Sequence, residues 1–173
     1  MNERQMTAAV DRYLTKTGSL PVHEVPIGPC RLDIVAYDRK KKMFKVIECK
    51  RTKRDSGIGR TFGQTVTYIT AVKKDGLAFA RGVGRKLAPL TFDDWMEATE
   101  WGRQITVAFY VALSHEALSK IELIRDMKRF SPDVGIIRVK QDGSCRSYIH
   151  RRGKTYHRIA APRAIKIKIR RPG

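Results

Sequence analysis

The sequence predicts an α/β fold in which a central mixed sheet is flanked by helices. A helix-like segment comes first and is followed by three short strand-like segments, and a strand-helix-strand unit lies between residues 105 and 140. Crossover connections of this kind favour a mixed sheet with helices packed on it. With 173 residues, of which 42% are hydrophobic, residues 1–173 are expected to form a single domain with an ordinary core.

The N-terminal part of the sequence predicts one helix and three antiparallel strands. Apolar residues recur at three- and four-residue spacing between residues 2 and 16, with Asn2 as a suitable N-cap and Gly18 as a stop. The next segments are short, rich in β-branched or aromatic residues, and separated by turn-forming residues. These expected strands are residues 22–27, 30–37 and 43–49.

The middle of the chain predicts a basic loop, a helix and an inserted segment. Residues 51–60 lack apolar periodicity and contain two glycines, so a loop is expected to lead into a helix at residues 61–73. Residues 74–104 are interpreted as an insertion or lid that contains a loop around Gly82 and Gly84.

The C-terminal part predicts the strand-helix-strand unit and a basic extension. The pattern indicates a strand at residues 105–113, a helix at 114–130 and a strand at 134–140. A basic C-terminal extension covers about residues 144–173, and within it Ile alternates with Lys or Arg from residue 164 to 169. This alternation is typical of an edge strand with an exposed basic face.

Positive charge is the strongest global feature of the sequence. The chain has 36 Lys and Arg against 17 Asp and Glu, which gives a formal net charge of +19 and a pI near 10.3. Such an excess opposes folding through self-repulsion, so it indicates a polyanionic partner. Nucleic acid gains most from it, because neutralised phosphates release counterions. A membrane surface is a weaker candidate, because the basic residues are interleaved with strand-like segments.

Several classes of protein find no support in the sequence. No apolar run approaches the roughly 20 residues that a membrane helix needs, and the N-terminal residues lack the apolar region of a signal peptide. We therefore expect a soluble, cytoplasmic protein without a membrane partner. Cys30, Cys49 and Cys145 are widely spaced and form no CxxC pair, which argues against a disulfide framework, a zinc site or an iron-sulfur cluster.

The sharpest local feature is the segment IECK, residues 47–50, at the end of the third expected strand. Because strand side chains alternate, Glu48 and Lys50 project from the same face. Asp33 lies in the middle of the preceding strand, where an apolar residue would be the default, and the short connection allows it to meet this pair. The plain structural alternative is a solvated Glu-Lys ion pair on an exposed face.

Two carboxylates and a lysine in this arrangement suit the hydrolysis of phosphodiesters. Mg²⁺ takes oxygen ligands, and Asp33 and Glu48 can hold it together with water, a scissile phosphate and the main-chain carbonyl of Cys49. Lys50 would then stand beside the attacking water, where it can orient the nucleophile, lower its pKa or stabilise charge on the phosphate. The expected cofactor is Mg²⁺ or Mn²⁺.

The order of these elements resembles that of the PD-(D/E)XK nuclease superfamily. The matching features are a first helix, then Asp33, then Glu48-Cys49-Lys50 on the next strand with 14 residues between Asp33 and Glu48, and then a helix. These features cover residues 2 to about 73. The resemblance implies a restriction-endonuclease-like fold with an αβββαβ core, which the unit at 105–140 extends. It also implies a metal-dependent nuclease that hydrolyses phosphodiester bonds in DNA, and many members of the superfamily are homodimers.

Further positions match the superfamily more loosely. Glu3 stands on the first expected helix, where many members carry an accessory acid, and Gln64 and Tyr68 match the QxxxY pattern of the RecB-like branch. Four residues apart on a helix, Gln64 and Tyr68 share a face and can both point toward the active-site edge. The sequence departs from the superfamily's Pro-Asp pair, because Leu32 precedes Asp33.

The basic residues that follow the motif are expected to contact nucleic-acid phosphates, because they continue directly from the catalytic strand. These residues are Arg51, Lys53, Arg54 and Arg60.

Three alternatives stand beside a RecB-like DNA nuclease. A structure-selective endonuclease of the Holliday-junction-resolvase type suits a small, basic, dimeric protein. A non-catalytic nucleic-acid-binding protein would use the charge alone, bind equally well in EDTA and cut nothing. An RNA-binding, ribosome-associated protein is favoured only by the high pI.

Overall fold

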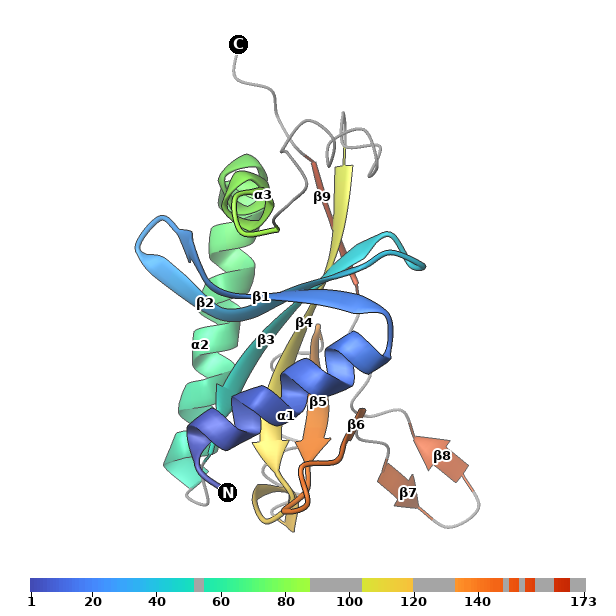
Figure 1. The fold of residues 1–173 in the computed structure, drawn as a ribbon. Coiled ribbons are helices and arrows are strands. Elements are labelled where there is room, and N and C mark those ends of the chain that lie inside the picture. The colour runs from blue at the N-terminus through green and yellow to red at the C-terminus, as the bar shows by residue number, and fades with distance from the viewer. Residues whose placement is uncertain are drawn as a thin grey trace.

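A mixed sheet forms the centre of the structure (Figure 1). The computed structural model of the chain describes residues 1–51, 55–87, 104–119, 133–147, 150–152, 155–157 and 164–168. Within these residues the strand order is β1-β2-β3-β4-β5-β6, with β9 also paired to β4, so the predicted α/β class and mixed sheet are confirmed. The strands of this sheet are β1 (Ser19–Ile27), β2 (Cys30–Asp38), β3 (Met43–Lys50), β4 (Gln104–Ser114), β5 (Val134–Val139), β6 (Cys145–Ser147) and β9 (Ile165–Lys168). A separate antiparallel pair consists of β7 (His150–Arg152) and β8 (Thr155–His157).

Helix α1 (Glu3–Lys16) confirms the first expected helix. The Asn2 side chain accepts the N–H of Gln5 at 2.8 Å, and the Gln5 side chain accepts the N–H of Asn2 at 2.8 Å, which together form a capping box. The chain leaves the helix through Gly18, whose φ of 82° is favourable only for glycine. The buried stripe of α1 consists of Met6, Ala9, Val10 and Leu14.

The three strands after α1 are antiparallel neighbours, as expected. β3 then pairs in parallel with β4, from Phe44 opposite Val107 to Lys50 opposite Leu113. Parallel neighbours need a crossover connection, and the helices between β3 and β4 belong to that crossover. β3 therefore joins the antiparallel unit to the rest of the sheet.

Helix α2 (Asp55–Lys74) is longer than predicted. The prediction of a basic loop up to residue 60 is wrong for residues 55–60, because these residues form the first turns of the helix. Ile58 is fully buried in the core, and this packing offsets the poor helix propensity of the glycines around it. None of the described helices is long and apolar enough to cross a membrane.

Helix α3 (Gly76–Gly84) replaces the loop that was expected around Gly82 and Gly84, so this expectation is wrong. Gly82 lets α3 lie close to β1, since a β-carbon at this position would be 3.1 Å from both the Pro26 carbonyl oxygen and a methyl group of Val25. The glycine therefore serves close helix-strand packing. The remainder of the predicted insertion or lid, residues 88–103, lies outside the described residues.

The strands of the predicted strand-helix-strand unit are confirmed, because β4 and β5 are parallel neighbours. Ser114, the expected start of the helix, is the last residue of β4, and its Oγ accepts the N–H of Ala117 at 3.4 Å. This contact caps the short 3-10 helix η1 (Ala117–Ser119), and residues 120–130 lie outside the described part of the chain. The basic edge strand expected at residues 164–169 is confirmed as β9, which is antiparallel to β4.

Hydrophobic cores lie on both faces of the sheet. α2 and α3 pack on one face and α1 packs on the other (Figure 1). Along β3, Val46 belongs to the core under α2 and Ile47 to the core under α1. The alternation of strand side chains therefore turns Glu48 toward α2.

Candidate active site

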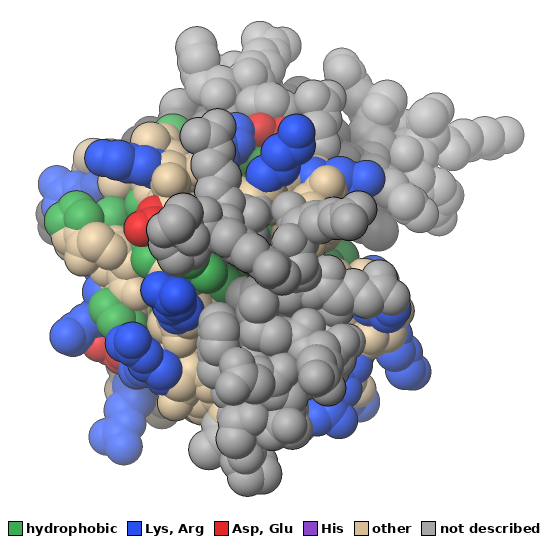
Figure 2. Space-filling model, turned by 90° about the horizontal axis from the view of Figure 1, so that it is seen from above, with side chains coloured by type: hydrophobic (Ala, Val, Ile, Leu, Met, Phe, Trp, Pro, Cys, Tyr) green, Lys and Arg blue, Asp and Glu red, His purple; other side chains and the backbone are tan. Residues whose placement is uncertain are grey.

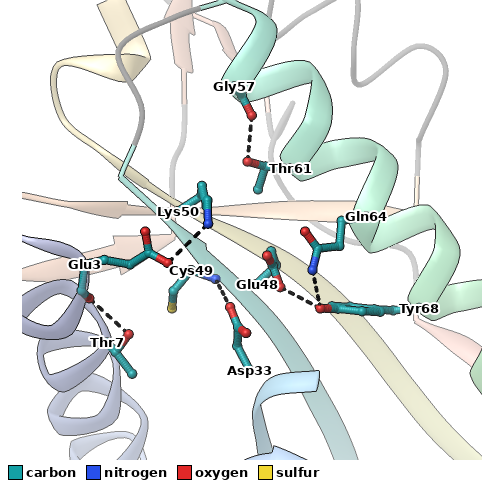
Figure 3. Close-up of polar contacts among 10 residues, drawn as sticks. All are labelled: Glu3, Thr7, Asp33, Glu48, Cys49, Lys50, Gly57, Thr61, Gln64 and Tyr68. Atoms are coloured by element: carbon teal, nitrogen blue, oxygen red, sulfur yellow. Dashed lines mark hydrogen bonds and ion pairs between the residues drawn. The ribbon is translucent and has the colours of Figure 1, made fainter. Parts of the chain in front are cut away.

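Asp33 and Glu48 lie on neighbouring strands, β2 and β3, close to the side chains that α2 presents (Figure 3). In the register of these strands Ile34 is opposite Ile47, which places Asp33 opposite Glu48 one residue further along. Residues directly opposite each other on antiparallel strands have β-carbons about 4.5–5.5 Å apart. Glu48 is only 2% exposed, whereas Asp33 is partly buried. The structure thus brings the two predicted carboxylates together.

The pairing of β2 with β3 stops at this carboxylate pair. Ile34 and Ile47 are the last paired residues of the two strands. After them, the main-chain N–H of Cys49 donates to the side-chain oxygen Oδ2 of Asp33 at 3.1 Å. The N–H and C=O of one residue point to the same side of an antiparallel strand, so the carbonyl of Cys49 also faces β2. Its thiol belongs to the core under α1, where burial raises the thiol pKa. Cys49 therefore offers the site its main chain and not its sulfur.

An irregularity in β1 and β2 coincides with Asp33. Glu24 falls opposite Asp33 in the register but is not paired with it, and its φ of 54° is uncommon for a residue other than glycine. On each strand near this point, two residues that are three positions apart both face the core under α2 and α3. These residues are Val22 and Val25 on β1, and Leu32 and Val35 on β2. Strict alternation would place them on opposite faces, so both strands change phase beside the carboxylate pair.

Tyr68 of α2 contacts Glu48, and Gln64 of the same helix contacts Tyr68 (Figure 3). The Tyr68 hydroxyl accepts a hydrogen bond from Gln64 Nε2 at 2.7 Å. Its own proton has two acceptors within reach, Glu48 Oε2 at 3.0 Å and the main-chain carbonyl oxygen of Arg31 at 2.9 Å. Because Tyr68 is 2% exposed, these contacts are shielded from water and fix the position of the Glu48 carboxyl group.

Lys50 lies two residues after Glu48, and its Nζ is 3.3 Å from Glu3 Oε1 at the start of α1. The side chains of Lys50 and Glu3 are 44% and 51% exposed, so the pair contributes only about 0–1 kcal/mol. A contact this weak lets the ammonium group turn toward an anionic ligand. The predicted accessory acid Glu3 is therefore placed beside the predicted lysine.

Burial is the main electrostatic influence on Glu48, and the neighbouring carboxyl group of Asp33 acts in the same direction. Burial, the negative charge of Asp33 and hydrogen bonding between the two groups raise the pKa of Glu48 to about 8. The Tyr68 hydroxyl and the positive charge of Lys50 act in the opposite direction but are outweighed. Without a cation, the pair therefore retains a proton at neutral pH.

The donor set fits a hard divalent cation. Such a cation binds oxygen, and a positive charge between Asp33 and Glu48 would offset both the burial and the repulsion by Asp33 that raise the pKa of Glu48. The Cys49 carbonyl, which faces the same strand, would be the third oxygen ligand of such a cation. Among the described residues no cluster of three or more His, Cys, Asp or Glu side chains could hold a metal ion. Water and substrate would thus have to complete the coordination, as is usual for Mg²⁺.

Of the four residues predicted to contact nucleic-acid phosphates, the structure describes two, and both are exposed. Arg51 directly follows β3 and is exposed, and Arg60 is exposed on α2. Lys53 and Arg54 lie outside the described residues.

Two features of the site were missed by the sequence analysis. Arg31 takes part through its main-chain carbonyl, which leaves no trace in the sequence. Glu24 has a positive φ beside Asp33, and its exposed carboxylate pairs with the Arg31 side chain at 2.8 Å. The unusual glutamate in a strand otherwise rich in Val and Pro was the only available signal.

The chain was also compared with known proteins. No family model matches the sequence, and neither the search of curated proteins nor the search of solved structures found a significant match.

Proposed function

We propose that this protein is a metal-dependent deoxyribonuclease of the restriction-endonuclease-like type, with Asp33, Glu48 and Lys50 in its active site. The observation that carries the proposal is the approach of Asp33 and Glu48 where the β2–β3 ladder is interrupted, with Lys50 two residues beyond Glu48 on the same strand. Two carboxyl groups that face each other in a sheet interior are costly to ionise together unless a cation lies between them. The order of helix, antiparallel strands, helix and parallel strand supports the same proposal.

In this proposal the carboxylates of Asp33 and Glu48 and the carbonyl of Cys49 hold Mg²⁺ or Mn²⁺. When bound, the ion would polarise the scissile phosphate and lower the pKa of the attacking water. Tyr68 and Gln64 keep Glu48 in position, since the hydroxyl is bound on one side by Gln64 and lies 3.0 Å from Glu48 on the other.

Lys50 acts on the phosphate in this proposal. Its ammonium group leaves Glu3 and approaches the phosphate, where a positive charge stabilises the negative charge that develops in the transition state. Glu3 then serves as the resting partner that keeps Lys50 near the site.

DNA is the proposed substrate because of the charge of the protein. The net charge of +19 favours a polyanion, and the exposed Arg51 and Arg60 extend the positive surface beside the site. No described element has the character of a base-reading helix, so contacts to phosphates would dominate and affinity would depend little on sequence.

The experiment that tests the proposal is a cleavage assay with plasmid, linear duplex, four-way junction and single-stranded DNA, each with Mg²⁺, Mn²⁺ or EDTA. Asp33→Asn and Glu48→Gln keep the size of the side chains and should abolish cleavage while DNA binding is kept. Preferential cleavage of the junction would favour a resolvase-type enzyme. Full activity of either variant, or of the wild type in EDTA, would refute the proposed chemistry.

A non-catalytic nucleic-acid-binding protein is the second candidate, favoured by the net charge alone. Such a protein would bind DNA or RNA with the same affinity in Mg²⁺ and in EDTA and would leave every substrate intact. The same assay therefore separates the two candidates.

A further inference from the structure

The side chain of Arg31 has no part in the site described above, although its main chain does. The Tyr68 hydroxyl lies 2.9 Å from the Arg31 carbonyl oxygen and 3.0 Å from Glu48 Oε2 (Figure 3). The Arg31 side chain, in contrast, is 71% exposed. Arg31 is therefore anchored beside the carboxylate pair by its main chain and carries an exposed positive charge there.

Arg31 and Asp33 project from the same face of β2. Cys30 and Leu32 both pack in the core under α2 and α3, so the two residues that alternate with them project away from that core. The change of phase in β2 comes after Asp33, because the next residue, Ile34, belongs to the core on that opposite face. From there the Asp33 carboxyl group reaches the main chain of β3. The α-carbons of Arg31 and Asp33 are two residue steps, or roughly 6.6 Å, apart.

Lys50 lies at the same end of the strand pair as Arg31. It comes two residues after Glu48 on β3, whereas Arg31 comes two residues before Asp33 on β2, and the two strands are antiparallel. Both cations therefore lie past the point at which the β2–β3 ladder stops. Each meets an exposed glutamate, Lys50 at 3.3 Å and Arg31 at 2.8 Å, and exposed pairs of this kind contribute little to stability. An anionic ligand can thus replace either glutamate.

The partner of Arg31 is Glu24, whose backbone is strained. Its φ of 54° lies in the left-handed region, which glutamate rarely adopts, and an exposed ion pair offsets this cost only in part. Irregularities in a strand re-aim side chains and are frequent next to functional sites. A strained residue that directs its carboxylate at an exposed arginine beside Asp33 indicates a functional pair.

The overall charge does not by itself locate a contact with DNA. Figure 2 shows Lys and Arg side chains spread over the face of the molecule seen from above, with few Asp and Glu among them. Arg31 is distinguished from an ordinary surface cation by its fixed position two residues from Asp33. Its guanidinium group can also donate two parallel hydrogen bonds to one phosphate.

We propose that Arg31 binds the backbone phosphate next to the one that is cleaved, and that Glu24 is its partner when no DNA is bound. The position of this phosphate rests on the proposed nuclease function, whereas the contact with DNA does not. On binding, the guanidinium group exchanges a carboxylate for a phosphate. Glu24 lowers the affinity for DNA, because its charge competes for Arg31 and repels the phosphate.

The test of binding compares Arg31→Gln with Arg39→Gln by fluorescence anisotropy with a labelled duplex of about 20 base pairs, in EDTA, over a series of salt concentrations. Arg39 is also exposed and follows the other end of β2, roughly 26 Å from Arg31. If Arg31 contacts one phosphate, Arg31→Gln should make the slope of log K against log salt less negative by about 0.9 and lower the affinity about eightfold at about 0.1 M salt. Arg39→Gln should keep the wild-type slope, and equal slopes for the two variants would overturn the proposal.

The variant Arg31→Lys separates a lost contact from a disturbed backbone. It keeps the charge and should keep the wild-type slope. Melting temperatures should be unchanged in all variants, because the side chain is exposed and the carbonyl that meets Tyr68 remains. A slope as shallow as that of Arg31→Gln would attribute the change to the backbone and overturn the contact.

A double-mutant cycle tests the role of Glu24. Glu24→Gln keeps the shape of the side chain and should raise the affinity for DNA several-fold at low salt. In the Arg31→Gln background the same substitution should have a much smaller effect, because no guanidinium group remains to be released. Equal effects in both backgrounds would show that Glu24 only repels DNA, and would overturn its role as the partner of Arg31.

The test of position uses duplexes in which one phosphate is replaced by a neutral methylphosphonate. The wild type should cut the bond next to the neutral linkage less than other bonds, and Arg31→Gln should lose this difference. A salt slope that depends on Arg31, without any cleavage by the wild type, would keep the contact and refute the nuclease. Cleavage by the wild type, with equal slopes and equal cleavage patterns for Arg31→Gln and Arg39→Gln, would keep the nuclease and overturn the contact.

Discussion

Replacing Glu48 by Gln should make the metal-free protein more stable at alkaline pH. Glu48 is buried opposite Asp33, and its pKa is raised from 4.5 to about 8. The amide of Gln has the shape of the protonated acid, can accept from Tyr68 and can donate to Asp33. The variant therefore keeps the neutral form of the pair at every pH.

The size of the effect follows from proton linkage. Because the pKa of Glu48 is higher in the folded protein, the folded state holds a proton that the unfolded chain releases between pH 4.5 and about 8. The contribution of Glu48 to stability is thus fully present below this window and is lost as the pH rises through it. The free energy of unfolding should fall by about 1.4 kcal/mol per pH unit, or roughly 3 kcal/mol from about pH 5 to about pH 7.5.

Urea unfolding of both proteins in EDTA, followed across this pH range, measures the effect. Titrating groups that do not interact with Glu48 are common to both proteins and cancel in the difference between their free energies of unfolding. Asp33 does interact with it, so the difference reports the carboxylate pair as a whole. We expect the wild type and Glu48→Gln to differ little near pH 5 and the variant to be several kcal/mol more stable near pH 8. Mg²⁺ should then stabilise the wild type and not the variant. Parallel pH profiles would refute the reasoning.

Four further substitutions test other parts of the structure. Lys50→Ala should slow single-turnover cleavage at least tenfold, about 1.4 kcal/mol, with DNA affinity nearly unchanged; a pure loss of affinity would contradict its proposed role. Gln64→Ala should slow cleavage by a similar factor while the melting temperature stays the same, and unchanged cleavage would reduce the QxxxY match to coincidence. Tyr68→Phe removes the one hydroxyl proton that Glu48 and the Arg31 carbonyl share, and also the acceptor of Gln64 Nε2, so it should lower the free energy of unfolding in urea by about 1–3 kcal/mol; an unchanged midpoint would show that these contacts are not formed. Gly82→Leu should lower the free energy of unfolding by about 1–3 kcal/mol, because α3 lies against β1. The control Gly63→Leu places its side chain in open space and should leave this free energy unchanged or raise it slightly. Equal effects of the two substitutions would argue against the close packing.

Local patterns were sufficient to predict α1, the three antiparallel strands and the placement of Glu48 and Asp33. The capping residue Asn2 and the apolar spacing of α1 act within a few residues, and strand alternation is equally local. The helix that carries Gln64 was also predicted, although it begins at Asp55. Its first turns were missed because the burial of Ile58 depends on the assembled core.

Tertiary packing decided the features that the sequence could not reveal. Glycine at position 82 reads as a loop signal, yet here it permits the approach of α3 to β1. The positive φ of Glu24 has no sequence signature, because glutamate ordinarily avoids that conformation.

The parallel pairing of β3 with β4 has a consequence for how the protein folds. The β1–β3 unit closes through short turns, whereas Phe44 must find Val107 across the whole α2–α3 crossover. Loop closure makes such distant pairing slow compared with hairpin formation. The carboxylate pair should therefore assemble early, on a three-strand unit whose β3 edge is still open. Until β4 docks, that edge is a template for pairing with other chains, so refolding yield should fall as protein concentration rises.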